Sequence, residues 1–396
     1  MKTIVVGVTG GIAAYKSAYL VSQLVKAGYS VYVVMTASAQ KFIAPLTLQT
    51  LSKHPVVTGM FEKTENWEVE HISLAKKADA FVICPATANV IGKIAGGIAD
   101  DFLTTTVMAA TCPVIFAPAM NCDMYENPIV QKNIETLSKL GYRFVEPESG
   151  MLACGVEGKG RLAEMEAILD EISCALCSEQ DFLGRKVLVT AGPTREAIDP
   201  VRYITNHSSG KMGYAIAKAA KIRGAQVTLV SGPTNLRPFS GVQVINVTTA
   251  LEMEQAVLSQ YAACDVVVKA AAVADFRPER KAENKLKKSG VDAPKITLVQ
   301  NPDILEELGR QKNGQILVGF CMETQNLLDN AKEKLHAKHL DMIVANSLTE
   351  AGAGFAGDTN AVTILFSDGR QERVECMQKL DLANLILDRV KGSHLW

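Results

Sequence analysis

Aromatic residues and net charge are both scarce in this 396-residue chain. Aromatics make up 6% of it, and 41 Lys plus Arg nearly cancel 42 Asp plus Glu. Without an excess of one sign, no overall field favours nucleic acid or an anionic membrane as a partner. No segment approaches the roughly 18 uninterrupted apolar residues of a membrane span. We therefore expect no nucleic-acid or membrane partner, and any anion-binding site must be local.

The nine cysteines lack the regular spacing of a disulfide framework or a zinc site. Cys174 and Cys177 form one CxxC pair, but no second pair supplies the other two zinc ligands. A helix face explains this pair better. The apolar start of the chain is not a signal peptide, because glycines interrupt it and no cleavage-like site follows. These absences favour reduced thiols and a cytoplasmic protein.

The length exceeds that of one ordinary core and favours two domains. Short apolar runs alternate with helical spacing, which predicts an α/β fold of two Rossmann-like domains. The first would be a flavodoxin-like parallel sheet and the second an α/β nucleotide-binding domain. We predict domains at 1–183 and 184–396, with a linker at 179–184. The predicted strands are 4–8, 29–35, 80–84 and 113–117, then 186–190, 226–231, 265–270, 316–320, 341–345 and 362–366.

In each half a strand leads through glycines into a helix. Residues 9–11 (Thr-Gly-Gly) precede a predicted helix at 12–26, and residues 208–210 (Ser-Ser-Gly) come shortly before one at 214–223. Such a junction places backbone N–H groups beside the positive end of the helix dipole, which suits a phosphate. Neither loop matches the dinucleotide GxGxxG or the P-loop GxxxxGK[ST] pattern. A tight turn without a ligand remains the alternative.

Polar segments occur near the predicted strand ends of the first half, where open α/β sheets bind ligands. These segments contain His71, residues 85–89, residues 118–124 and Cys154. Taken singly, each has a plain alternative. His71 could be a surface helix residue, Asn121 a turn residue and Cys154 a small buried side chain.

Taken together, the segments resemble a known family over about residues 1–180. They are similar to the flavin-containing cysteine decarboxylases, and most of all to the phosphopantothenoylcysteine decarboxylases. The resemblance implies FMN as cofactor. A flavin can oxidise the substrate thiol, which provides an acceptor for the electrons that CO2 loss leaves behind. The matching motifs are residues 9–13, His71, 85–89, 118–121 with Met124, and 153–155.

The same resemblance implies the roles of individual residues. His71 would be a base or would position the substrate carboxylate, and Asn121 would hold that carboxylate. Cys154 would donate a proton from a glycine-rich flap. The implied FMN contacts are Thr9, Gly10, Gly11, Thr36, Ser38, Thr87 and Asn89.

Lysines and amides gather near the predicted strand ends of the second half. Residues 285–288 could be a solvated basic loop, and Lys334 with Lys338 an ordinary i,i+4 helix face. Residues 301–303 on their own predict the start of a helix. Grouped in a nearly neutral domain, however, these residues could bind a triphosphate.

Over about residues 186–390 the chain resembles the bacterial, CTP-using phosphopantothenate–cysteine ligases. The matching residues are 206–213, 271–275, 285–288, 301–304, Phe320, Lys334 and Lys338. The resemblance implies that Lys285 helps to form an acyl-cytidylate and that Asn206 stabilises it for attack by cysteine. Mg2+ would be carried mainly by CTP, with Asp275 as a candidate neighbour. The implied CTP contacts are Asp275, Lys285, Asn301, Pro302, Asp303, Ile304, Phe320, Lys334 and Lys338.

The two constellations together predict a bifunctional enzyme of coenzyme A biosynthesis. Its substrates would be 4'-phosphopantothenate, cysteine and CTP. The resemblance also implies a homo-oligomer with trimeric flavin domains and dimeric ligase domains. One alternative is another flavin decarboxylase, or a flavin prenyltransferase, fused to an unrelated nucleotide-binding domain. A regulatory FMN-binding protein is a second alternative, which the joint presence of His71, Asn121 and Cys154 disfavours.

Overall fold

The computed structural model describes residues 1–60, 70–151, 157–287, 295–322, 326–346, 357–393 and 396. The chain divides into two compact units, Met1–Ser178 and Glu179–Trp396. Among the described helices, none has the length and apolar character needed to cross a membrane.

The first unit is built on a six-stranded parallel sheet with the strand order β3-β2-β1-β4-β5-β6. Its two central strands, β1 and β4, are buried along their whole length. Burial on both faces explains why their sequences are almost continuously apolar. The strands are β1 (Thr3–Val8), β2 (Ser30–Met35), β3 (Val56–Val57), β4 (Ala80–Ala86), β5 (Val114–Pro118) and β6 (Arg143–Phe144).

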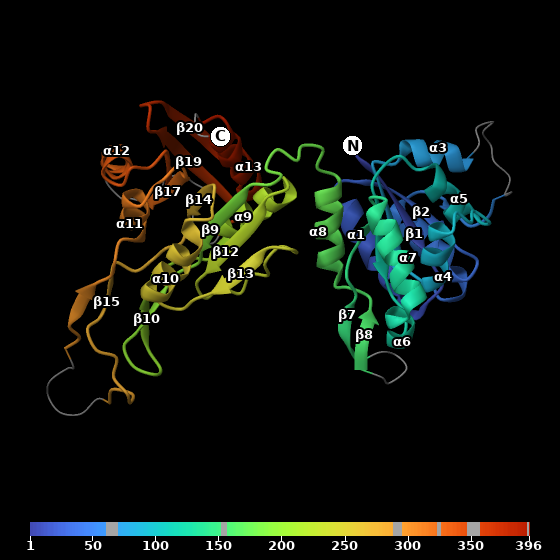
Figure 1. Ribbon diagram of the computed structural model, residues 1–396, viewed down its shortest axis with the longest axis horizontal. Coiled ribbons are helices and arrows are strands. Elements are labelled where there is room, and N and C mark those ends of the chain that lie inside the picture. Colours follow the sequence, from blue (N-terminus) through green and yellow to red (C-terminus); the bar gives the residue numbers. More distant parts are fainter. Residues whose placement is uncertain (61–69, 152–156, 288–294, 323–325, 347–356, 394–395) are drawn as a thin grey trace. The chain divides into compact units, whose positions relative to one another are not determined.

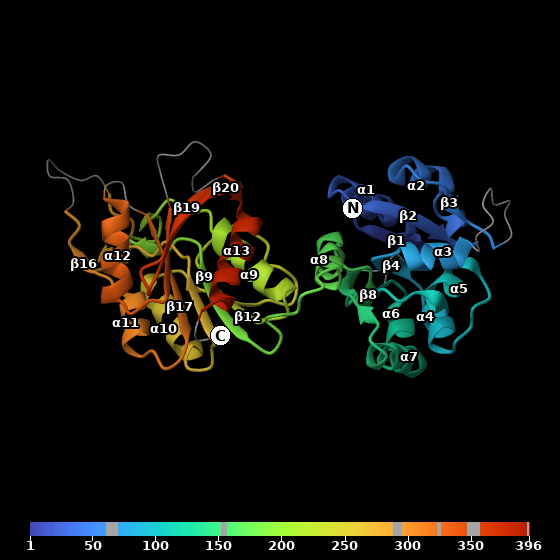
Figure 2. The ribbon, with the colours of Figure 1, turned by 90° about the horizontal axis from the view of Figure 1, so that it is seen from above.

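Helices cover both faces of this sheet (Figures 1 and 2). One face packs against the 3-10 turn η1 (Ile12–Lys16) and the helices α1 (Ser17–Lys26), α2 (Pro45–Ser52) and α8 (Met165–Ala175). The other face packs against α3 (Glu70–Lys77), α4 (Ala88–Ala95), α5 (Phe102–Ala109) and α7 (Pro128–Lys139). The short helix α6 (Cys122–Glu126) and an antiparallel pair, β7 (Glu148–Met151) and β8 (Glu157–Arg161), lie beside one end of the sheet.

The second unit contains an eight-stranded sheet with the order β13-β12-β9-β14-β17-β18-β19-β20. The first six strands in this order are parallel, and β19 and β20 continue the sheet antiparallel. The strands are β9 (Lys186–Ala191), β12 (Gln226–Ser231), β13 (Gln243–Asn246), β14 (Val266–Lys269), β17 (Ile316–Met322), β18 (Met342–Asn346), β19 (Thr359–Phe366) and β20 (Gln371–Gln378).

Helices again cover both faces. The helices α9 (Lys211–Ile222) and α13 (Lys379–Lys391) cover one face, and α10 (Ala250–Tyr261), α11 (Ile304–Arg310) and α12 (Leu327–Ala337) cover the other (Figures 1 and 2). Two short antiparallel pairs extend from this body: β10 (Arg195–Ala197) with β11 (Tyr203–Thr205), and β15 (Phe276–Pro278) with β16 (Leu298–Gln300).

These sheets confirm the predicted α/β fold class, and each predicted strand corresponds to a strand of the structure. The main element that the sequence did not predict is β20, whose side chains are largely exposed and therefore lack an apolar run. Helix α9 begins at Lys211 rather than at residue 214. Phe182, within the predicted linker, is fully buried in the core of the second unit.

Candidate functional site

The glycine loop of the first unit is joined to a neighbouring strand end by Thr9. This threonine is fully buried. Its Oγ1 donates a hydrogen bond to the Pro85 carbonyl at 2.7 Å and accepts one from the Thr87 N–H at 3.2 Å. Thr87 in turn caps α4, where its hydroxyl accepts a bond from the Val90 N–H. The loops that follow β1 and β4 therefore form one connected surface at the carboxyl edge of the sheet.

The loop after β2 closes onto the same surface. A Cβ atom at Gly10 would lie 2.4 Å from the Cβ of Ser38, so only glycine permits this approach. Thr36 anchors the loop, because its N–H donates to the Val8 carbonyl at 3.1 Å and its Oγ1 accepts from the Ala39 N–H at 3.2 Å. Six of the seven predicted flavin residues are thus brought together. Asn89 is exposed in the first turn of α4.

Asn121 lies beyond the end of β5 and caps α6. Its Oδ1 accepts the N–H groups of Asp123 at 2.8 Å and Met124 at 3.4 Å. The alternative that Asn121 is a turn residue is therefore correct for its side-chain oxygen, which caps the N-terminus of α6. A role in binding a substrate carboxylate would fall to its Nδ2 group.

The antiparallel pair of β7 and β8 packs on the segment that precedes α6. The Met120 N–H donates to the Gly160 carbonyl at 3.0 Å. Gly160 has φ of 154°, and a Cβ there would lie 2.4 Å from the Met120 oxygen. Glycine is required for this contact. Cys154, the predicted proton donor, is in the segment 152–156 and lies outside the described residues.

His71 belongs to the first turn of α3 and packs against α5. Its ring meets that of Phe102 edge to face, with the ring centroids 6.2 Å apart. The catalytic role of His71 stays a prediction.

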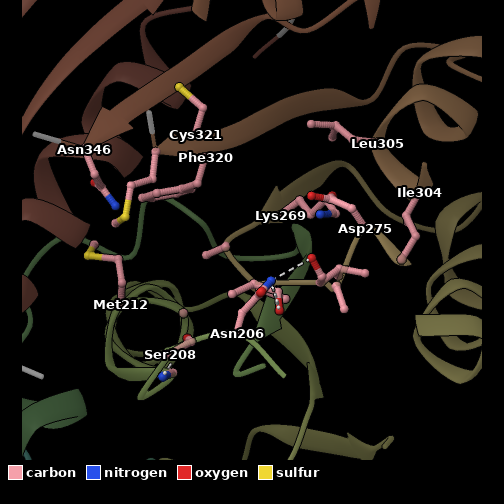
Figure 3. A pocket seen from close by; sticks show the side chains of 18 of the residues that line it. Asn206, Ser208, Met212, Lys269, Asp275, Ile304, Leu305, Phe320, Cys321 and Asn346 are labelled. Atoms are coloured by element: carbon pink, nitrogen blue, oxygen red, sulfur yellow. Dashed lines mark hydrogen bonds between the residues drawn. The ribbon is translucent and has the colours of Figure 1, made fainter. Parts of the chain in front are cut away.

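In the second unit, a cavity of about 840 Å³ opens at the carboxyl ends of the central parallel strands (Figure 3). Its walls come from the loop before α9, the ends of β14, β17 and β18, the start of α11, and helices α12 and α13. It is lined by nine of the predicted ligase residues: Asn206, Asp275, Asn301, Pro302, Asp303, Ile304, Phe320, Lys334 and Lys338.

Several of these predicted contacts have side chains that interact within the protein itself. Asn301 is buried; its Nδ2 donates to the Ala274 carbonyl at 2.7 Å, and its Oδ1 accepts from Arg277 at 3.0 Å. Ile304 is a core residue. Their side chains hold the wall of the cavity in place. Asn206 also lines the cavity, and its Nδ2 donates to the Val273 carbonyl at 3.0 Å.

The acidic and basic groups at one end of the cavity interact strongly. Asp303 caps α11 and accepts a hydrogen bond from the Lys338 ammonium. Partial burial raises the pKa of Asp303, but these hydrogen bonds outweigh it and hold the pKa below its usual value. The carboxylate is therefore charged at neutral pH and keeps Lys338 directed toward the cavity.

Sequence reasoning missed Lys269, which lies at this end of the cavity. Burial lowers the pKa of Lys269 to about 8, against the attraction of Asp303 and Asp275, while Lys338 and Lys334 lower it further. A lysine at the last position of a buried, otherwise apolar strand was the available signal, because such a position normally carries an apolar residue.

Lys285 is exposed and is not among the residues that line the cavity. Its neighbour Leu286 is fixed through both backbone groups: the N–H donates to Asp199 at 3.2 Å, and the carbonyl accepts from Arg202 at 2.9 Å. Hydrogen bonds from Arg202 hold the pKa of Asp199 well below its usual range despite burial. The loop that carries Lys285 is therefore anchored to the turn between β10 and β11. Lys288 lies outside the described residues.

Comparison with known proteins adds to this geometry. Residues 1–176 match the Flavoprotein family model, and residues 182–393 match the model described as DNA/pantothenate metabolism flavoprotein C-terminal domain. The coenzyme A biosynthesis bifunctional protein CoaBC of Bacillus subtilis is 50% identical over 392 residues, covering 98% of this chain and 96% of its own. The protein of the same name from Borreliella burgdorferi is 46% identical, with 98% of each chain covered.

A protein of an unknown prokaryotic organism named cysteine/cysteine sulfinic acid decarboxylase is 45% identical, covering 88% of this chain and 98% of its own. A solved C-terminal domain of a CoaBC protein is 42% identical, covers 54% of this chain and 97% of its own, and has a TM-score of 0.47. The two matched family models and the similarity over nearly the whole length show that the chain belongs to the family of coenzyme A biosynthesis bifunctional proteins.

Proposed function

We propose that this bifunctional enzyme first joins cysteine to 4'-phosphopantothenate at the expense of CTP and then decarboxylates the product to 4'-phosphopantetheine. The observation that carries the ligase assignment is the cavity of the second unit, where a strand-end lysine, two helix lysines and a helix N-terminus line one space. Nucleotidyl transfer depends mainly on positioning and charge stabilisation, and such groups supply both.

In the ligation, the carboxylate of phosphopantothenate attacks the α-phosphorus of CTP. An acyl-cytidylate forms and pyrophosphate leaves. Lys285 stabilises the charge that develops on the reacting phosphate. Asn206 stabilises the cytidylate while the cysteine amine displaces CMP. Mg2+ enters with the phosphates of CTP, near the exposed Asp275, since the described residues offer no cluster of three metal-binding side chains.

The first unit fits a flavin, because the glycine loop after β1 is braced by Thr9 against Pro85 and Thr87, and the loop after β2 approaches it at Gly10, at the carboxyl end of a parallel sheet. Bound FMN would supply reversible two-electron oxidation of the substrate thiol. In our assignment, Asn121 holds the substrate carboxylate through Nδ2. His71 acts as a base or positions that carboxylate, and Cys154 returns a proton after CO2 has left.

The proposal is tested by incubating the full chain with FMN, Mg2+, CTP, phosphopantothenate and cysteine. We expect mass spectrometry to show phosphopantothenoylcysteine, CMP and then phosphopantetheine. Without CTP, added phosphopantothenoylcysteine should still lose CO2. Because one relative is named a cysteine decarboxylase, free cysteine serves as the competing substrate. Faster CO2 release from free cysteine than from phosphopantothenoylcysteine would contradict the proposed second step.

Cys154→Ser tests the proton donor. A serine hydroxyl is a far weaker acid than a thiol, whose reference pKa is about 8.5. The variant should release CO2 about once per site and accumulate a product two mass units lighter than the normal one. Turnover of the variant at a near-normal rate would show that Cys154 is not the proton donor.

We further infer a homo-oligomer that acts in the cytoplasm, with trimeric flavin units and dimeric ligase units. Large apolar side chains are exposed on η1 and α1, next to the glycine loop, at Ile12, Tyr15 and Tyr19. In the second unit, Phe276 and Leu298 are exposed on the β15–β16 pair. Exposed apolar groups of this kind favour association. Light scattering of the full chain would give the number of subunits.

A further inference from the structure

The turn between β10 and β11 contains a buried carboxylate, Asp199, whose two oxygens bond to different parts of the chain. Asp199 is 2% exposed. Its Oδ1 accepts the N–H groups of Val201 and Arg202, both at 2.8 Å. Such bonds from a side chain to the backbone two and three residues on are typical of turns formed by aspartate and asparagine. The first oxygen is therefore explained by the turn itself.

The second oxygen, Oδ2, bonds to a segment that is distant in the sequence. It accepts the Leu286 N–H at 3.2 Å, and it accepts Nε and Nη2 of Arg202 at 2.9 and 2.5 Å. Arg202 Nη2 also donates to the Leu286 carbonyl at 2.9 Å. Both backbone groups of Leu286 are thus held, one by the carboxylate and the other by the guanidinium that the carboxylate orients. The turn does not require these contacts.

A further hydrogen bond joins the same two segments. The Ala282 N–H donates to the Ile198 carbonyl at 2.9 Å. The described part of the loop after β15, residues 279–287, contains no helix or strand of its own. Its course therefore depends on contacts with neighbouring segments, and the turn at 198–202 provides three of them.

Asp199 carries its charge at neutral pH. Hydrogen bonds from Arg202 hold the pKa of Asp199 well below its usual range, against the opposing effect of burial. A buried carboxylate is costly unless it is paired and hydrogen-bonded. A buried ion pair often adds little net stability, and its best-attested use is to fix one arrangement of the chain. The arrangement that Asp199 fixes is the position of the loop.

The loop held in this way carries Lys285, and the hairpin that holds it leads to Asn206. Lys285 directly precedes Leu286. Asn206 directly follows β11 and lines the cavity. One turn therefore connects the two residues to which the two steps of the ligation are assigned.

We propose that Asp199 is a positioning residue for acyl-cytidylate formation, which holds the backbone of Leu286 and thereby places the Lys285 ammonium. The inference rests on the proposed role of Lys285 in the ligation. Asp199 itself contacts neither CTP nor phosphopantothenate. Stabilisation of a developing charge depends on the exact position of the cation, so a small displacement of the loop lowers the rate and leaves substrate binding nearly unchanged.

Asp199→Asn in the full-length enzyme separates the two functions of this side chain. Its amide oxygen can still accept from the turn, whereas its amide nitrogen cannot accept from Leu286 or Arg202. Asp368→Asn is the matched control, because Asp368 accepts the N–H of Arg370 at 2.9 Å and its Nε at 2.6 Å in the turn between β19 and β20, and is not among the residues that line the cavity. Asp199→Ser is a second variant whose hydroxyl can also accept from the turn. Thermal unfolding verifies that each variant is folded.

Rapid quenching without cysteine, followed by mass spectrometry, measures acyl-cytidylate formation. We expect Asp199→Asn to lower its rate constant roughly 10- to 100-fold, with little change in the concentrations of CTP and phosphopantothenate that give half the maximal rate. Asp368→Asn should behave as wild type. In the Lys285→Gln background, Asp199→Asn should cause no further loss, because the two residues act as one unit. Losses that multiply in the double variant, or normal rates in folded Asp199→Asn and Asp199→Ser, would overturn the proposal.

The position of the loop is measured separately from the ligation. Trypsin cleaves after lysine, and mass spectrometry of the fragments reports the cleavage after Lys285. In Asp199→Asn this cleavage should proceed at a rate about fivefold or more above that of wild type and of Asp368→Asn, because the loop has lost its anchor. Wild-type enzyme that forms no acyl-cytidylate from CTP and phosphopantothenate would refute the ligation, whereas the cleavage rate would still decide on the anchor. Cleavage of Asp199→Asn at the wild-type rate would refute the inference.

Discussion

The glycine loop of the first unit and that of the second follow equivalent strands, β1 and β9, but differ in construction. In the first, η1 begins directly after Gly11, and buried Thr9 bonds to the next strand end. In the second, the chain forms the pair of β10 and β11 before it reaches Gly210 and α9. The compact connection joins two neighbouring strand ends directly, whereas the longer connection borders a cavity of about 840 Å³.

The two units also differ in the structural elements that surround each site. The second unit supplies lysines, amides and phenylalanine from helices α9, α12 and α13 and from strands β14, β17, β18 and β19. The first unit places its loops, Asn121 and the β7–β8 pair along one edge, and exposes apolar residues beside the glycine loop. A neighbouring copy that covers those residues would complete the flavin site, as the proposed trimer requires.

The largest expected effect concerns the two steps assigned to the second unit. Lys285→Gln should slow acyl-cytidylate formation about a thousandfold, because it removes a cation beside the developing charge. Asn206→Asp should slow the later attack by cysteine, so that the cytidylate persists. Quenched reactions analysed by mass spectrometry measure the intermediate. Lys287→Gln, on the same exposed loop, is the control; if it matches Lys285→Gln, the loop is merely a solvated basic segment.

The next effect tests whether the two units are stabilised independently. Phe182 is fully buried, and its ring contacts Trp396 at a centroid distance of 4.4 Å. Phe182→Ala should lower the unfolding free energy of the second unit by about 3 kcal/mol, since it leaves a cavity in the core. The unfolding of the first unit should not change. Leu183→Ala, at an exposed neighbour, is the control in calorimetry. A shift in both transitions would show that the units unfold together.

A smaller effect is expected when the two hydrogen bonds of the Thr9 hydroxyl in the first unit are removed. Thr9→Val keeps the shape of the side chain but leaves the Pro85 carbonyl and the Thr87 N–H without their partner, at a cost of about 1–3 kcal/mol. FMN affinity should fall about tenfold and ligation should be unchanged. The buried Thr106, whose hydroxyl bonds within α5, provides the control Thr106→Val. Equal FMN affinities of Thr9→Val and Thr106→Val would show that Thr9 does not contribute to flavin binding.

The sequence predicts the parts of both units that depend on apolar patterning. Strands such as β1, β4 and β9 are buried on both faces and therefore read as continuous apolar runs. By contrast, β20 alternates in a mostly exposed pattern at the sheet edge and gives no such signal. The sequence also did not show where the linker ends and the core of the second unit begins, because Phe182 is a single aromatic residue within a polar segment.

The resemblance identified nine residues of the ligase cavity, but it could not say how each is used. Asn301 and Ile304 line the cavity while their side chains serve the protein interior. Lys269 was missed because it is one lysine at the end of a strand. Its significance comes from partial burial and from the charged neighbours Asp303 and Lys338, which are distant in sequence and which only the fold brings together.

The smallest effect is a pH dependence at Lys269. Burial lowers its pKa from 10.5 to about 8. In the folded protein its ammonium is therefore lost as the pH rises through 8, and an anionic nucleotide loses a partner. We expect the wild-type KM for CTP to rise a few-fold between pH 7.5 and about 9.5. Lys269→Met should show a higher KM with little change over this range, and Lys269→Arg, which stays charged, should keep a low, nearly flat KM.

Stability should move in the opposite direction. Because the folded-state pKa is below the unfolded value, the unfolded chain binds more protons between pH 8 and 10.5, and the stability linked to Lys269 rises over that window. Below pH 8 the folded protein bears the cost of holding a partly buried ammonium. Lys269→Met should therefore be more stable than wild type at pH 7, with an advantage that shrinks as the pH rises, while it binds CTP more weakly. Denaturant unfolding at pH 7 and 9.5, with CTP kinetics at the same values, measures both. A variant that is less stable at pH 7 and has an unchanged KM would show that Lys269 serves the fold and not the nucleotide.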